Sequence, residues 1–138
     1  MPEYIADTNV YIMAANDEKF RSRFESFIRT HGPLLVSAVV AGEFLIGIAD
    51  VSRHAPALEA LRDGSEVVAP AADDWFLAGA AISRLGGGAV TKGRSFWNDA
   101  LLAAQCARLG ATLITLNQAD FRRLRAHTRV RAIVPFPK

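Results

Sequence analysis

Three acidic residues lie in apolar surroundings, where a carboxylate is costly to place. Asp7 directly follows a short apolar run, Glu43 lies within the otherwise apolar stretch 39–46, and Asp99 stands just before the apolar run 100–104. A buried carboxylate must find solvent, a partner or a cation. Taken singly, Asp7 is typical of a helix cap and Asp99 of a favourable first-turn charge. Only their combination suggests a site.

More oxygen-bearing side chains follow the apolar run 112–116. Asn117 comes directly after it, and Asp120 comes three residues later. In open α/β sheets, functional sites lie at the carboxyl ends of the strands, so we expect these residues near Asp7. Several carboxylates in one place repel and raise one another's pKa values, which implies a bound cation. Hard oxygen ligands favour Mg²⁺ or Mn²⁺ over zinc.

The elements that must position these residues alternate between strand-like and helical patterns. Short apolar runs, flanked by polar or turn residues, alternate with segments of helical period, which is typical of an α/β fold with a mostly parallel sheet. We expect five short strands, at residues 4–6, 34–36, 66–69, 112–116 and 132–134.

Five helices are expected from capping residues and apolar spacing. One begins after Asp17 and ends at Gly32, and a second is capped by Ser37 and buries Val40, Phe44, Leu45 and Ile48. A third is capped by Ser52. A fourth follows Pro70, with Trp75, Ala78, Ile82 and Leu85 on one face, and a fifth is capped by Ser95 and ends at Gly110.

The composition fits one compact domain over residues 1–138. With 51% hydrophobic and 22% charged residues, the chain is too apolar to be disordered. Its most apolar stretch is interrupted by Ser37 and Glu43, which argues against a membrane span. A single cysteine, Cys106, fits a reducing compartment, and no secretory leader is recognisable, so we expect a cytoplasmic protein.

The order of these motifs resembles that of PIN-domain ribonucleases, and most of all the VapC-type toxins of bacterial and archaeal toxin–antitoxin pairs. Each motif is weak alone, and the ordered set is specific. The resemblance runs from residue 4 to about residue 136 and rests on four segments, namely 7–9 (DTN), 37–47 (SAVVAGEFLIG), 98–103 (NDALLA) and 115–121 (TLNQADF).

This resemblance implies a fold and an acidic centre. The fold would be a PIN-like three-layer sandwich, with a central mostly parallel sheet of about five short strands flanked by helices. Asp7 and Asp99 would be the main Mg²⁺ ligands and Glu43 the third acidic member. The fourth position is open between Asn117 and Asp120. Asn9, Thr115 and Asn117 would support the site, with Thr115 positioning a water or simply completing its strand.

The implied activity is hydrolysis of RNA phosphodiester bonds by a Mg²⁺- or Mn²⁺-dependent endoribonuclease. The metal would acidify the attacking water, and Glu43 or Asp120 would orient or deprotonate it. The resemblance also implies a toxin neutralised by a cognate VapB-like antitoxin, a homodimer, and a larger toxin–antitoxin assembly. It does not identify the RNA target, the antitoxin or the number of metal ions.

The net charge of +2 hides basic residues that suit an RNA substrate. Residues 122–138 contain six Lys and Arg and no acid, and Lys92 and Arg94 shortly precede Asp99. An acidic metal site repels RNA unless the surrounding charge is positive, so we expect Lys92, Arg94 and Arg122 to contact phosphates. The arginines at 21, 23 and 29 are equally well explained by a solvated helix face.

Two other functions compete with this interpretation. Asn117 is neutral and would bind a metal ion weakly. The alternative function is therefore a catalytically weak PIN-like module that binds RNA or protein. A phosphatase that transfers phosphate through Asp7 is disfavoured, because such enzymes usually have a second Asp two residues later and Asn9 stands there.

Overall fold

The structure is a computed structural model that describes residues 3–87 and 94–133. Within these ranges β1 (Tyr4–Ala6) pairs with β4 (Thr112–Ile114), and β4 pairs with β5 (Arg131–Ile133). β2 (Val36–Ser37) pairs with β3 (Val67–Val68). All these pairs are parallel, and a parallel bridge between residues 5 and 35 joins the two groups. The strand order is therefore β3-β2-β1-β4-β5, which confirms the predicted sheet.

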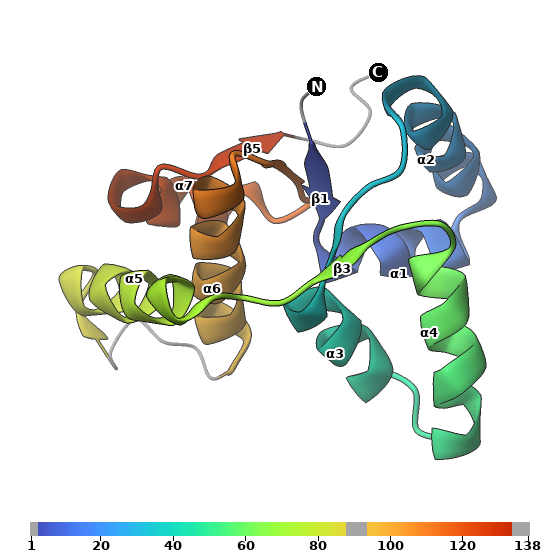
Figure 1. The fold of residues 1–138 in the computed structure, drawn as a ribbon, viewed down its shortest axis with the longest axis horizontal. Helices are drawn as coiled ribbons and strands as arrows, with labels where there is room; N and C mark the ends of the chain where they lie inside the picture. Colours follow the sequence, from blue (N-terminus) through green and yellow to red (C-terminus); the bar gives the residue numbers. More distant parts are fainter. Residues whose placement is uncertain (1–2, 88–93, 134–138) are drawn as a thin grey trace.

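Alternation along the central strands directs side chains into two helical layers. Ile5 and Leu113 pack with α5 (Ala72–Arg84), α6 (Arg94–Leu109) and α7 (Gln118–Thr128). Ala6 and Ile114 pack on the other face with α1 (Thr8–Asn16) and α2 (Glu18–His31). Figure 1 shows α5, α6 and α7 on one side of β1 and the first two helices on the other. The three-layer architecture is confirmed.

Helix α6 passes through the centre of the core and carries Asp99 near its start. Residues 100–106 of this helix are at most 3% exposed. The fully buried Gln105 accepts a hydrogen bond from Ser37 Oγ at 2.6 Å and donates one to the Val68 carbonyl at 3.1 Å. These bonds satisfy the amide in the interior and tie α6 to β3 and to the start of α3 (Ala38–Ile46).

Two predicted helix starts are confirmed by the capping geometry. Asp17 accepts a hydrogen bond from the Phe20 amide at 3.0 Å, and α2 ends before Gly32, whose φ is +84°. Ser37 caps α3 by accepting from the Val39 amide at 3.2 Å. A side-chain oxygen that binds a free amide of the first turn is the expected capping interaction.

Two predicted caps are wrong. Ser52 does not cap a helix, because the Asp50 carboxylate accepts from both the amide and the hydroxyl of Ser52 and starts a 3₁₀ turn (Val51–Arg53). The third helix, α4 (His54–Arg62), begins only after this turn. Ser95 is not a cap either, because α6 already begins at Arg94.

The predicted buried faces also need correction. Trp75 is 45% exposed, because only the Ala78 and Ile82 side of α5 faces the core. Ile48 lies beyond the end of α3. The strands predicted at 66–69 and 112–116 are shorter, at Val67–Val68 and Thr112–Ile114.

The sequence patterns did not predict α7. Its basic residues obscure a buried stripe formed by Phe121, Leu124 and Thr128. Their spacing of three and four residues is a helical signal that was available in the sequence. Within residues 3–87 and 94–133, no helix has both the length and the apolar character needed to cross a bilayer.

Candidate metal centre

Asp7 lies at the carboxyl end of β1 and caps α1, so the strand end fixes its position. Its Oδ1 accepts from the Thr8 amide at 2.8 Å, and its Oδ2 accepts from Thr115 Oγ1 at 2.9 Å and Asn9 Nδ2 at 3.2 Å. The side chain is buried. Burial raises the pKa of Asp7, the bonds from Thr115 and Thr8 lower it, Glu43 raises it, and the net shift is upward.

Glu43 approaches from α3 and is held by two residues that the sequence patterns did not single out. Its Oε1 accepts from Thr8 Oγ1 at 2.9 Å, and its Oε2 accepts from Asn98 Nδ2 at 3.3 Å. Both donors sit beside an acidic residue, Thr8 next to Asp7 and Asn98 next to Asp99. Glu43 is therefore linked to α1, which Asp7 caps, and to α6, which carries Asp99.

Asp99 is the residue most affected by the gathering of charge. It is 6% exposed, and its pKa is raised to about 8 by burial, then by the negative charges of Asp7, Asp120 and Glu43. A side-chain hydrogen bond to Asp120 raises the pKa further. Two carboxyl groups can share such a bond only when one of them keeps a proton. The structure thus brings all four predicted acids into one electrostatic cluster.

Asn117 and Asp120 have different positions in this cluster. Asn117 caps α7, donates from Nδ2 to Asp120 Oδ2 at 3.0 Å, and donates from its backbone amide to Thr115 Oγ1 at 3.0 Å. Thr115 in turn donates to Asp7. A continuous hydrogen-bonded chain therefore runs from Asp120 to Asp7. The side chain of Asn117 orients Asp120. Of these two residues, Asp120 forms the side-chain hydrogen bond with Asp99.

A basic residue missed by the sequence analysis also faces the cluster. Arg123 lies 3.8 Å from the Asp120 carboxylate, and its guanidinium stands 5.1 Å from the centre of the Phe96 ring. Its spacing of three residues from Asp120 on a helix was the signal available in the sequence. The guanidinium partly offsets the acidic charge on the α7 side of the cluster.

Carboxylate and amide oxygens are suitable ligands for a hard divalent cation, but the side chains that carry them are too far apart in this structure to coordinate one together. Among residues 3–87 and 94–133, no three His, Cys, Asp or Glu side chains are gathered closely enough to hold an ion. Coordination requires ligand oxygens about 2.0–2.6 Å from the ion, whereas charges repel over longer distances. The repulsion that raises the pKa of Asp99 is what a cation would relieve.

The predicted phosphate contacts are only partly described. Arg122 is exposed on α7, and Arg94 is the first residue of α6. Lys92 lies outside the described residues. A role in RNA binding for these three residues stays a prediction.

Comparisons with known proteins agree with this fold. The chain resembles VapBC from Salmonella typhimurium, solved bound to DNA, with a TM-score of 0.78, 16% identity and coverage of 99% of this chain and 100% of that chain. It also resembles VapBC2 from Rickettsia felis, solved with a promoter DNA fragment, with a TM-score of 0.72, 20% identity and coverage of 95% and 97%.

A third similar structure is a toxin–antitoxin complex from Klebsiella pneumoniae, with a TM-score of 0.70, 17% identity and coverage of 99% and 100%. No curated protein sequence matches the chain. The PIN domain family matches residues 4–126, which include all four acids of the cluster and most of the fold. The chain therefore belongs to the PIN-domain family.

Proposed function

We propose that this chain is a Mg²⁺- or Mn²⁺-dependent endoribonuclease that acts as the toxin of a type II toxin–antitoxin pair. The observation that carries the proposal is the cluster of four acids, from the end of β1 and from α3, α6 and α7, in which burial and then the three other negative charges raise the pKa of Asp99 to about 8. A cluster of acids that is only partly compensated by Arg123 costs stability, so its presence favours a functional role with a cation.

Asp7, Asp99 and Glu43 would hold the metal, and Asp120 would complete the acidic centre. A bound divalent ion would neutralise charge on the phosphate and acidify the attacking water. The chain's own residues keep the ligands in place. Thr115 and Asn9 hold Asp7, while Asn117 holds Asp120. Asp120 and Glu43 are the candidates for orienting that water.

Chelation is the direct test of this proposal. We expect the purified chain to cleave a mixed RNA substrate with Mg²⁺ or Mn²⁺, to lose cleavage in EDTA, and to recover it when the ion is added in excess. Mn²⁺ binding should be detected by electron paramagnetic resonance without RNA. A chain that bound no Mn²⁺ at millimolar concentration would instead support the alternative, a catalytically weak module that binds RNA or protein.

The open arrangement of the carboxylates is the observation that favours this alternative. The excess of negative charge in the cluster argues against this alternative, because a module that only binds RNA or protein gains nothing from carboxylates that repel one another. The Mn²⁺ measurement distinguishes the two functions without relying on the choice of RNA substrate.

The toxin role requires an antitoxin, and we propose a cognate VapB-like protein as that partner. Support comes from the similar structures, which are VapBC and toxin–antitoxin complexes. Co-expression of this chain with the product of an adjacent small reading frame should give a stable complex in which RNA cleavage is suppressed. Unchanged cleavage by such a complex would contradict the toxin role.

We further propose that the chain forms a homodimer through an apolar groove beside Glu43. The groove, of about 410 Å³, is bordered by Ile46 of α3 and Trp75 of α5, which are 65% and 45% exposed. Exposed apolar patches of this kind commonly mark protein interfaces.

A charge in this groove should dissociate the dimer. Ile46→Glu is expected to halve the mass measured by sedimentation equilibrium, because a carboxylate cannot be buried there without a partner. Val51→Glu is the matched control, since Val51 is 73% exposed and does not border the groove. Equal masses for the two variants would contradict an interface at this groove.

A further inference from the structure

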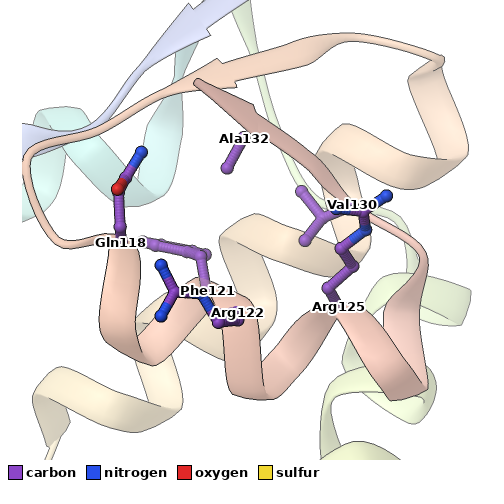
Figure 2. A pocket seen from close by; sticks show the side chains of 6 residues that line it. All are labelled: Gln118, Phe121, Arg122, Arg125, Val130 and Ala132. Atoms are coloured by element: carbon purple, nitrogen blue, oxygen red, sulfur yellow. The ribbon is translucent and has the colours of Figure 1, made fainter. Parts of the chain in front are cut away.

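A polar pocket lies along α7, on another face of this helix than Asp120. It has a volume of about 190 Å³ and is lined by four residues of α7 and two from the segment that faces it. Figure 2 shows Gln118, Phe121, Arg122 and Arg125 on the helix, with Val130 and Ala132 opposite. Phe121 and Val130 are buried, so they form an apolar interior beneath the polar rim.

The rim of this pocket carries two exposed cations. Arg122 and Arg125 are three residues apart on one helix, which places them side by side. Within the part of the chain that the structure describes, neither forms an ion pair, in contrast to Arg123, which faces Asp120. Two adjacent guanidinium groups are suited to bidentate recognition of a phosphate.

Helix α7 carries both the pocket and Asp120, on different faces. Gln118 lies in the same first turn as Asp120, and Arg125 follows Asp120 by five residues, which is about 7.5 Å along the axis and about 140° around it. An RNA strand with its scissile phosphate at the carboxylates that continues around α7 would bring a flanking nucleotide to the pocket.

We propose that this pocket binds a nucleotide that flanks the cleavage site of a single-stranded RNA. Arg122 and Arg125 bind its phosphate, while the apolar interior receives its base and the Gln118 amide hydrogen-bonds to the base edge. Unstacked bases of single-stranded RNA are recognised by such a combination of apolar contact, guanidinium groups and edge hydrogen bonds. This inference rests on the proposed ribonuclease function, since it assigns part of the same substrate.

The phosphate contact is tested by the salt dependence of RNA binding. A fluorescein-labelled single-stranded RNA oligonucleotide is titrated with the full chain in EDTA, where cleavage is absent, at several KCl concentrations. For Arg122→Ala/Arg125→Ala we expect the slope of log K against log salt to fall by about 0.7 for each lost contact. Arg23→Ala/Arg29→Ala is the matched control, because these arginines are exposed on α2, which Figure 1 shows on the opposite side of the molecule.

The pocket interior is tested without a change of charge. Ala132→Leu should fill the pocket and weaken RNA binding about fivefold or more with an unchanged salt slope, because base contacts are lost. Ala132→Ser, which keeps the small volume, should bind as the wild type does. If Ala132→Leu does not fold by circular dichroism, Gln118→Ala supplies the charge-neutral test, since alanine favours a helix.

Equal loss of affinity and slope in the two double-arginine variants would overturn the proposal, because it would show general attraction only. Wild-type affinity of the pocket-filling variant, or of Gln118→Ala where that variant replaces it, would also overturn it. Failure of the ribonuclease function is seen separately, as wild-type protein that binds RNA through α7 but does not cleave it with Mg²⁺.

Discussion

Asp7→Asn is expected to reduce RNA cleavage at least about 100-fold while leaving the chain folded. Loss of second-sphere partners of a metal ligand typically costs about 10–100-fold, so loss of the ligand charge itself should cost more. The amide still accepts one hydrogen bond at the strand end, which preserves the cap of α1. Initial cleavage rates at saturating Mg²⁺, with circular dichroism as the check of folding, provide the measurement.

Asp17→Asn is the matched control for this substitution. It makes the same chemical change at another helix cap, where Asp17 binds the Phe20 amide on the surface and an asparagine caps equally well. Cleavage by this variant should equal that of the wild type. If Asp7→Asn cleaved RNA as fast as Asp17→Asn, the assignment of Asp7 to the metal centre would be refuted.

The hydrogen bond from Thr115 to Asp7 allows a finer version of the same test. Thr115→Val removes the hydroxyl that bonds Asp7 Oδ2 and accepts from Asn117, and should lower the cleavage rate about 10–100-fold. Thr115→Ser keeps the hydroxyl and should recover most of the rate. Equal rates for the two variants would show that this residue only completes its strand.

Asp99→Asn is expected to stabilise the metal-free protein at pH 8 and to remove most of the pH dependence of its stability. Because the folded state holds the Asp99 proton up to a pKa of about 8 and the unfolded chain releases it near 3.8, the folded state binds more protons between these values. The free energy of unfolding of the wild type therefore falls as the pH rises from about 4 to about 8.

The expected gain at pH 8 is on the order of a few kcal/mol, because one pKa unit corresponds to about 1.4 kcal/mol. Asparagine has the shape of a protonated aspartate and donates to Asp120 without the added charge. Urea unfolding in EDTA at several pH values is the measurement. A variant no more stable than the wild type at pH 8 would contradict the described repulsion in the cluster.

Mg²⁺ should reverse the ranking of the two proteins. A cation that binds only the folded wild type raises its free energy of unfolding with ion concentration, and it should stabilise Asp99→Asn much less because one ligand charge is missing. The same unfolding experiment with excess Mg²⁺ tests this. Equal stabilisation of both proteins would show that Asp99 is not a ligand.

Much of the fold was predictable because local patterns determined it. The caps at Asp17 and Ser37, the left-handed Gly32 and the parallel α/β alternation all depend on residues close together in sequence. The errors occurred where two local signals competed. The Asp50 carboxylate accepts from the amide and the hydroxyl of Ser52, so Ser52 does not cap a helix. In α7, the many charged residues made the helical spacing of the buried residues hard to recognise.

The sequence by itself determined which side chains could form a hard-cation site, since Asp7 and Asp120 follow strands, and Glu43 and Asp99 interrupt apolar stretches. Only the tertiary structure decided how they interact. The bonds from Thr8 to Glu43, from Asn98 to Glu43 and from Thr115 to Asp7 join residues 35, 55 and 108 positions apart. The raised pKa of Asp99 likewise depends on burial and on charges from other elements of the fold. Such contacts leave no local pattern, because packing of the three layers creates them.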